Sequence, residues 1–178
     1  MYAIMIVEDE ELIRQGLTSL VDYEQFGMAV INQAENGREA WEKFQEQPAD
    51  ILLTDINMPQ MNGLDLAHLV KEQSPSCHII FLTGYDDFEF ARKAIKLGAD
   101  DYLLKPFSKD DIEEMLAKVK GKLDQERMKK AQLLLLTTDL KIYEIADQVG
   151  FEDMNYFSQR FKQVVGVTPR QYKKGEHE

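Results

Sequence analysis

The stretch Ile51-Leu52-Leu53-Thr54-Asp55, followed by Ile56-Asn57-Met58-Pro59, decides the fold that we expect for this chain. Four residues that suit a buried position end abruptly in the carboxylate of Asp55, and Pro59 prevents the strand from continuing. A short apolar run bounded by turn signals is typical of a strand that is covered on both faces, as in parallel sheets. Asp55 would then stand at the carboxyl end of a central strand, where open α/β sheets place their binding sites.

Five segments of the chain suit strands, and helical patterns separate them. The strands are expected at residues 2–7, 28–34, 51–55, 78–82 and 101–104. Helices are expected at residues 11–23, around residues 40–44, at residues 64–70 and at residues 87–97, the last of them capped by Gly98. This alternation predicts an α/β domain with a five-stranded, parallel, doubly wound sheet of the flavodoxin-like type, with helices on both faces.

Composition and charge distribution predict a soluble cytoplasmic protein with two functions. The chain has 178 residues, of which 44% are hydrophobic, and its single cysteine suits a reducing cytosol. No apolar run approaches the roughly 18 to 20 residues that span a bilayer, so we expect no membrane association. Residues 1–124 carry 12 Lys and Arg against 24 Asp and Glu, whereas residues 125–178 carry 9 against 8. This asymmetry indicates that the two halves have different roles.

Polar side chains follow four of the predicted strands: Glu8 and Asp9, Asp55, Thr83 and Lys105. Because the carboxyl ends of parallel strands meet at one rim, we expect these side chains to lie together. Carboxylates in such a cluster repel one another by about 4 kcal/mol per pair at roughly 4 Å with an effective dielectric of about 20. Oxygen ligands of this kind favour Mg²⁺ as the balancing cation. A carboxylate beside Mg²⁺, an ammonium and a hydroxyl is suited to accept a phosphoryl group.

The motifs Val7-Glu8-Asp9, Asp55-Ile56-Asn57-Met58-Pro59, Thr83-Gly84 and Leu104-Lys105-Pro106-Phe107 resemble those of the receiver domain of bacterial two-component response regulators. The resemblance covers about residues 1–122. It implies that Asp55 is the phosphoacceptor and that Mg²⁺ is held by Glu8, Asp9, Asp55 and the backbone carbonyl of Asn57. Thr83 and Lys105 would contact the phosphoryl oxygens, and Tyr102 would be the aromatic residue that changes rotamer on activation.

A long helix is expected to connect the two halves of the chain. Ser108 is a suitable N-cap, with Asp111 as an approximate capping-box partner. Helical spacing of apolar residues continues to about Leu136, Gly121 is the only weak point before Leu133, and no proline interrupts the pattern. We therefore expect one long helix, or two nearly collinear ones, from Ser108 to about Leu136.

The back half contains the pattern of a helix-turn-helix unit. Residues 142–151 predict a short helix that ends at Gly150, a residue suited to the left-handed conformation. Asp153 can cap the next helix, which extends to Gly166 and contains the apolar residues Tyr156, Phe157, Phe161, Val164 and Val165. Thr168 and Pro169 then start a last short helix. Two short helices joined by a tight glycine turn form the DNA-binding unit, whose second helix enters the major groove.

Several positions of this unit suit DNA contacts. Asn and Gln side chains match the edge of adenine, and basic side chains match phosphates. The candidate DNA-binding residues are Asn155, Tyr156, Ser158, Gln159, Arg160, Lys162 and Arg170. Among these, Arg160 and Lys162 are expected to point at phosphates.

Residues 126–174 resemble the second helix-turn-helix unit of the AraC family, together with the linker helix before it. The resemblance rests on Ile142-Tyr143-Glu144-Ile145-Ala146, Tyr156-Phe157-Ser158-Gln159-Arg160-Phe161-Lys162 and Gly166-Val167-Thr168-Pro169-Arg170-Gln171-Tyr172. That family has two such units, and here the receiver-like part runs into the linker helix with no room for the first. We therefore expect residues 123–178 to be a truncated output domain, with an exposed apolar surface at Leu133–Leu136 that drives self-association.

The preferred interpretation is a response regulator without enzymatic turnover. A sensor histidine kinase would phosphorylate Asp55, and a homodimer would bind double-stranded DNA through its paired helix-turn-helix units. The alternative is a phosphorylation-controlled interaction protein whose shortened output no longer binds DNA. A phosphohydrolase is disfavoured, because it requires a general acid where Asn57 stands. His68 and His78 have no spacing that indicates a metal site, and both are expected to be structural.

Overall fold

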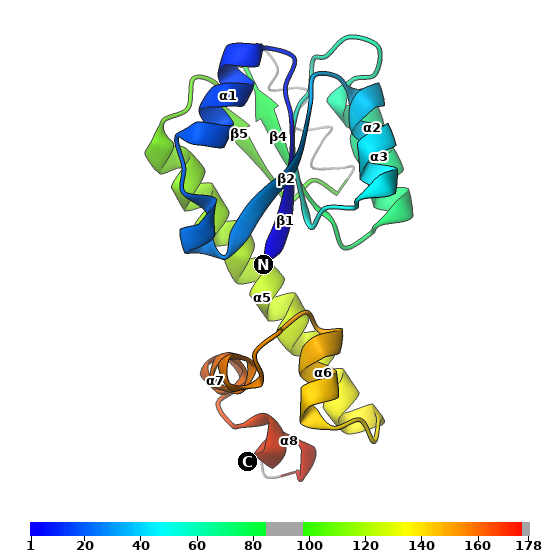
Figure 1. Ribbon diagram of the computed structural model, residues 1–178, viewed down its shortest axis with the longest axis vertical. Helices are drawn as coiled ribbons and strands as arrows, with labels where there is room; N and C mark the ends of the chain where they lie inside the picture. Colours follow the sequence, from blue (N-terminus) through cyan, green and yellow to red (C-terminus); the bar gives the residue numbers. More distant parts are fainter. Residues whose placement is uncertain (85–97, 176–178) are drawn as a thin grey trace. The chain divides into compact units, whose positions relative to one another are not determined.

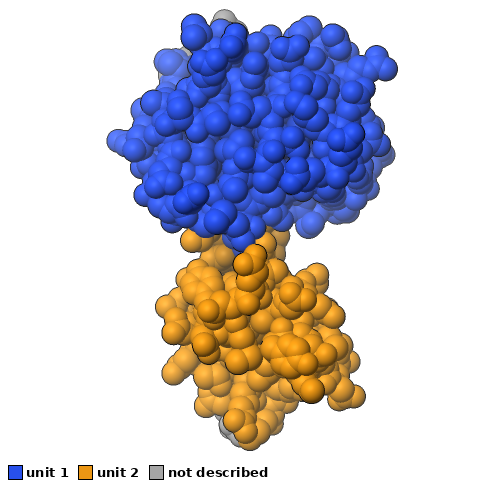
Figure 2. Space-filling view, in the orientation of Figure 1, with its two compact units in different colours: residues 1–119 blue, residues 120–178 orange. Residues whose placement is uncertain are grey.

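The computed structural model describes residues 1–84 and 98–175. The helix expected at residues 87–97 lies outside the described residues. The chain forms two compact units, residues 1–119 and residues 120–178 (Figure 2). Among the described residues, no helix combines the length and the hydrophobicity that crossing a bilayer requires.

The first unit contains the predicted parallel sheet. Its strands are β1 (Tyr2–Val7), β2 (Met28–Ala34), β3 (Ile51–Asp55), β4 (His78–Thr83) and β5 (Asp101–Leu104), in the order β2-β1-β3-β4-β5. The central strand β3 is buried at every position, which confirms the prediction from its apolar run. In the register of the sheet, Val7 pairs with Thr54 and Asp55 pairs with Leu82, so the carboxyl ends of the three central strands are level.

Helices cover both faces of this sheet. They are α1 (Glu11–Ser19), α2 (Gly37–Glu46), α3 (Gly63–Gln73) and the first part of α5 (Lys109–Thr137). Figure 1 shows α1 and α5 on one face and α2 and α3 on the other. One buried cluster joins the second face to the sheet and includes Met5, Leu52, Phe81, Phe44 and Leu66. Burial of this kind is the main stabilising contribution to the fold.

The first helix is shorter than the prediction. We expected it to reach about Tyr23, but α1 ends at Ser19, and a 3₁₀ turn occupies Tyr23–Phe26. The side chain of Asp22 accepts a hydrogen bond from the backbone N–H of Glu24 and starts this turn, and the Tyr23 hydroxyl donates to the Leu17 carbonyl at 2.6 Å. A local acceptor of this type competes with the helical hydrogen bonds, which explains the early end.

The connecting helix is one element rather than two. Helix α5 extends without interruption from Lys109 to Thr137, and the predicted cap is present. Ser108 N–H donates to Asp111 Oδ2 at 2.7 Å, and Asp111 N–H donates to Ser108 Oγ at 3.2 Å. Gly121 lies inside the helix without ending it.

The second unit contains the predicted helix-turn-helix. Its elements are the later part of α5, α6 (Ile142–Gln148), α7 (Met154–Val165) and α8 (Pro169–Lys173). Gly150 has a φ of 82° at the turn between α6 and α7, a backbone conformation that favours glycine. The core is formed by Met128, Ala131, Leu135, Ile145, Ala146, Val149, Phe151, Phe157 and Phe161. Two apolar residues of α7 differ from the expected pattern, since Tyr156 and Val164 are exposed.

Candidate functional site

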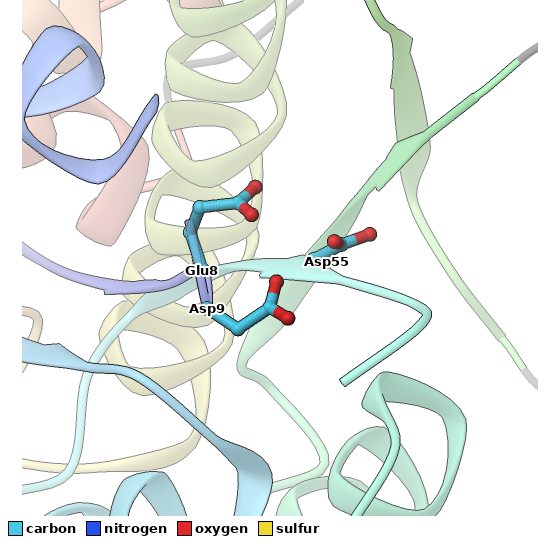
Figure 3. A group of neighbouring side chains, drawn as sticks. All are labelled: Glu8, Asp9 and Asp55. Carbon is cyan, nitrogen blue, oxygen red and sulfur yellow. The ribbon is translucent and has the colours of Figure 1, made fainter. Parts of the chain in front are cut away.

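Three carboxylates converge at the carboxyl rim of the sheet. Glu8 and Asp9 follow β1, and Asp55 is the last residue of β3. Figure 3 shows the three side chains as neighbours, and one carboxylate oxygen from each lies within 4.8 Å of the other two. Glu8 and Asp55 are buried and Asp9 is exposed, so the cluster opens to solvent on the side of Asp9.

Lys105 lies between two of these carboxylates. Its ammonium nitrogen is 2.8 Å from Glu8 Oε2 and 3.0 Å from Asp55 Oδ2. Burial of the ammonium lowers the pKa of Lys105, but the hydrogen bonds and charges of Glu8 and Asp55 outweigh this effect, so the net shift is upward. Lys105 therefore remains charged in the site.

The environment of Glu8 strongly affects its ionisation. Its burial disfavours the charged form, and the adjacent Asp55 carboxylate adds repulsion, while Lys105 opposes both. The pKa of Glu8 is raised to about 7. One ammonium is thus insufficient to offset the desolvation and repulsion that a charged Glu8 experiences.

This donor set fits a hard divalent cation. The three carboxylates supply only oxygen ligands, which Mg²⁺ prefers, and a second positive charge would favour the ionised form of Glu8. Glu8, Asp9 and Asp55 are the residues that would hold the ion. Asn57 is exposed in the loop after β3, and its backbone carbonyl was the fourth predicted ligand.

Two other predicted residues lie on neighbouring strands. Thr83 ends β4 and is fully buried, and its hydroxyl donates to the Gly84 carbonyl at 3.2 Å. Tyr102 lies on the edge strand β5, where 37% of the residue is exposed. In the strand order of the sheet, β4 and β5 follow β3. Thr83 and Tyr102 therefore lie on the same side of Asp55.

Sequence patterns did not indicate how closely Gly63 approaches Asp55. The Gly63 N–H donates to the Ile56 carbonyl at 2.9 Å, and a Cβ at Gly63 would lie 2.0 Å from the Asp55 carbonyl oxygen. The loop after β3 can therefore fold back only with glycine at this position. The sole signal in the sequence is the position of Gly63 at the start of a helical pattern.

The candidate DNA-binding residues occupy different environments in the second unit. Asn155, Tyr156 and Gln159 are exposed on α7, and Ser158 is half-buried. Lys162 and Arg170 are exposed on α7 and α8. The Asp153 carboxylate accepts a hydrogen bond from Tyr156 N–H at 2.8 Å and caps α7, as the sequence predicted.

Arg160, which we expected to point at a phosphate, has a partner within the chain. Its side chain is 30% exposed, and its guanidinium forms an ion pair with the buried carboxylate of Asp124 on α5. It also donates to Gln163 Oε1 at 3.0 Å. The sequence pattern did not indicate this partner, since Asp124 is one of many acids on α5 and lies 36 positions from Arg160.

The contacts of His68 and His78, the histidines of the described residues, lie outside the acidic cluster. His68 is exposed and lies 3.4 Å from Glu72 on α3. His78 is buried at the start of β4, and its Nδ1 lies 3.1 Å from Asp100 Oδ1.

Two family models match the chain. Residues 4–117 match the response regulator receiver domain, and residues 113–175 match a helix-turn-helix domain. Among solved structures, the receiver domain of AraT, a response regulator from Geobacillus stearothermophilus, is 44% identical with a TM-score of 0.69. The alignment covers 71% of this chain and 98% of that one. A two-component transcriptional regulator AraC from Clostridium phytofermentans is 35% identical with a TM-score of 0.62, over 66% of this chain and 92% of that one.

This chain spans half or less of the length of two curated relatives that it matches. The uncharacterized transcriptional regulatory protein YesN of Bacillus subtilis is 39% identical over 137 residues, which are 75% of this chain and 37% of YesN. The transcriptional regulatory protein HptR of Staphylococcus aureus is 34% identical over 127 residues, which are 71% of this chain and 50% of HptR. The chain therefore belongs to the response regulator receiver family, and an AraC-type helix-turn-helix domain follows its receiver domain.

Proposed function

We propose that this protein is a phosphorylation-controlled DNA-binding regulator whose phosphoacceptor is Asp55. The observation that carries the proposal is the position of Asp55, beside the carboxylates of Glu8 and Asp9 and 3.0 Å from the ammonium of Lys105. Structural ion pairs alone would not explain three convergent carboxylates with a single ammonium, because that set has an excess of negative charge.

The proposed reaction is phosphoryl transfer from a phosphohistidine of a sensor kinase. A carboxylate oxygen of Asp55 forms a bond to phosphorus while the phosphorus–nitrogen bond breaks and the imidazole leaves. Glu8, Asp9, Asp55 and the backbone carbonyl of Asn57 would hold Mg²⁺, which would supply positive charge for the transferring oxygens.

Lys105 and Thr83 have separate roles in this proposal. The ammonium of Lys105 is already 3.0 Å from Asp55 Oδ2 and moves its hydrogen bond to a phosphoryl oxygen. The Thr83 hydroxyl, which donates to the Gly84 carbonyl in the present structure, would turn to the same group. Tyr102 would change its rotamer in response to this movement of Thr83.

The output is binding to double-stranded DNA through α7. Asn155 and Gln159 are exposed on this helix four residues apart and therefore lie on one side of it. Lys162 and Arg170 supply positive charge for phosphates. One helix-turn-helix unit contacts a single stretch of groove, so we propose that two chains bind paired half-sites. Leu133 and Leu136, which are 60% and 58% exposed on α5, support self-association. We propose the cytoplasm, where both partners occur, as the location.

Sedimentation with and without beryllofluoride tests this proposal. Beryllofluoride represents the phosphoryl group on Asp55, and the protein is examined with Mg²⁺, alone and with a pool of mixed duplex DNA. We expect beryllofluoride to produce a dimer that sediments with DNA. The variant Asp55→Asn should remain unchanged by beryllofluoride and should not be labelled by a phosphodonor.

The other outcomes have definite meanings. A dimer that does not bind DNA would support an interaction protein in place of a DNA-binding regulator. Phosphoryl uptake by the Asp55→Asn variant would overturn the assignment of the phosphoacceptor.

A further inference from the structure

Asp124 is the only buried carboxylate among residues 120–175, the described part of the second unit. It lies on α5, and its side chain is 10% exposed. Its partner is Arg160 on α7, whose side chain is 30% exposed. A carboxylate that is removed from water requires a charged or hydrogen-bonding partner, so the position of Asp124 determines where the guanidinium of Arg160 is held.

A second polar contact from the same surface of α5 holds the turn of the helix-turn-helix. Arg127 donates from Nη1 to the Gly150 carbonyl at 3.1 Å, and its guanidinium lies 5.7 Å from the centre of the Phe151 ring. Asp124 and Arg127 are three residues apart and therefore lie on one side of the helix. Helix α5 thus holds α7 through Arg160 and the α6–α7 turn through Gly150.

The apolar core alone leaves the rotation of α7 less constrained. Phe157 and Phe161 face the core, four residues apart on α7. Aromatic contacts between Phe151, Phe157 and Phe161 have ring-centre distances of 5.4 to 5.8 Å and interplanar angles of 57° and 53°, within the range of arrangements that such pairs adopt. An ion pair between a planar guanidinium and a carboxylate is directional, so it can determine which side of α7 faces outward.

We propose that Arg160 is a positioning residue that orients α7, and that it does not contact DNA phosphates. The Asp124–Arg160 ion pair orients the helix so that Asn155 and Gln159 are presented to base edges, while Lys162 and Arg170 neutralise phosphates. This inference rests on the proposed DNA binding and deepens it, since it separates the residues that determine sequence preference from those that determine electrostatic affinity.

The salt dependence of DNA binding distinguishes an arginine that contacts a phosphate from one that only positions the helix. A side chain that contacts a phosphate contributes to the slope of log affinity against log salt, and its loss reduces that slope by about 1. A positioning residue changes the preference for one sequence over another and leaves the slope unchanged.

The experiment uses the full chain with Mg²⁺ and beryllofluoride. The probes are a duplex that the wild-type protein selects from a random-sequence pool and a scrambled duplex of equal length. For Arg160→Gln we expect an unchanged salt slope and a loss of about tenfold in the preference for the selected duplex, the size of one good base contact. Lys162→Gln is the matched control on the same helix, and it should reduce the slope by about 1 with little change in preference.

The partner residue provides an independent comparison. Asp124→Asn should reduce the preference by a similar factor, and the double variant should be no worse than either single variant, because both residues act through one interaction. Circular dichroism checks that each variant retains its helices. If Arg160→Gln does not fold, Arg160→Met, which keeps an unbranched side chain without the charge, takes its place, and the same outcomes apply.

Failure of the positioning role and failure of the proposed DNA binding give different results. A reduced salt slope for Arg160→Gln, or additive losses in the double variant, would overturn the positioning role while DNA binding stands. Absence of salt-dependent binding by the wild-type protein would overturn the proposed DNA-binding function and this inference together.

Discussion

At the residue scale, the candidate site shows how burial changes acids that the sequence presents as equivalent. Glu8 and Asp9 are adjacent, yet Glu8 is fully buried and Asp9 is exposed. Burial and the neighbouring Asp55 raise the pKa of Glu8 to about 7. Because the folded protein prefers the protonated form of Glu8, this group contributes stability at low pH, and the contribution is lost as the pH rises from about 4.5 to about 7.

This shift predicts a proton linkage for Mg²⁺ binding. The ion requires the ionised form of Glu8, so its affinity should fall as the pH is lowered below about 7, by up to about tenfold per pH unit. Binding near neutral pH should release protons. Calorimetric titrations with Mg²⁺ in two buffers of different ionisation enthalpy measure this release. Glu8→Gln should bind Mg²⁺ more weakly and release fewer protons; equal release by the variant would contradict the prediction.

At the element scale, Gly121 and Gly63 have opposite roles. Gly121 lies inside α5, and a Cβ placed there meets no atom within 4 Å. Gly63 starts α3 and lies against the backbone of Asp55, where a Cβ would be 2.0 Å from the carbonyl oxygen. The same substitution should therefore have opposite effects at the two positions.

We expect Gly121→Ala to stabilise the helix by about 0.5–1 kcal/mol, since alanine has the higher helix propensity. Gly63→Ala should lower the free energy of unfolding by at least about 2 kcal/mol, because the loop after β3 must move. Urea unfolding followed by circular dichroism measures the first effect, and the fluorescence of Trp41 reports the second. A neutral Gly63→Ala would show that this loop can shift without loss.

The early end of α1, at Ser19 where about Tyr23 was expected, is also explained by local contacts. Helical spacing extends through Val21, but Asp22 and Tyr23 form local hydrogen bonds that end the helix earlier. Leu12 and Leu20 are 85% and 52% exposed, although their spacing is that of a buried face. Periodicity describes which residues share a side of a helix, whereas only the neighbouring elements determine whether that side is covered.

At the scale of the whole molecule, the stability of the first unit at acid pH depends on Asp100, whose carboxylate contacts residues of α3 and β4. Asp100 Oδ2 accepts a hydrogen bond from Ile79 N–H at 2.9 Å and lies 3.4 Å from the Lys71 ammonium, and Oδ1 lies 3.1 Å from His78 Nδ1. Burial raises the pKa of Asp100, but the bonds to His78 and Ile79 outweigh it and lower the pKa to about 2. Since the folded pKa lies below the ordinary value of 3.8, the stabilisation is present above about pH 4 and is lost as the pH falls towards 2.

We expect Asp100→Asn to lower the free energy of unfolding at neutral pH by about 1–2 kcal/mol, a range that allows for partial exposure to solvent. The difference from the wild-type protein should decrease as the pH falls from about 4 to about 2. Urea unfolding monitored by Trp41 fluorescence across this range measures both quantities. Glu46→Gln, at an exposed acid of α2, is the control and should retain the wild-type profile. A constant difference at all pH values would contradict the assigned role of the carboxylate.

The sequence by itself determined the sheet, its strand positions and the set of polar residues at its rim. Apolar runs with a defined length and period specify buried strands, and parallel topology brings their carboxyl ends together. The helix-turn-helix was determined in the same way, by Asp153 as a cap and Gly150 as a left-handed residue.

Only the tertiary structure decided which charged side chains form ion pairs with one another. Lys105 lies between Glu8 and Asp55, and Arg160 is paired with Asp124, although the sequence suggested a phosphate contact for Arg160. Burial, pairing and pKa depend on atoms that are distant along the chain and adjacent in space. Periodicity and capping depend on neighbours within a few residues, and for that reason they could be recognised without the fold.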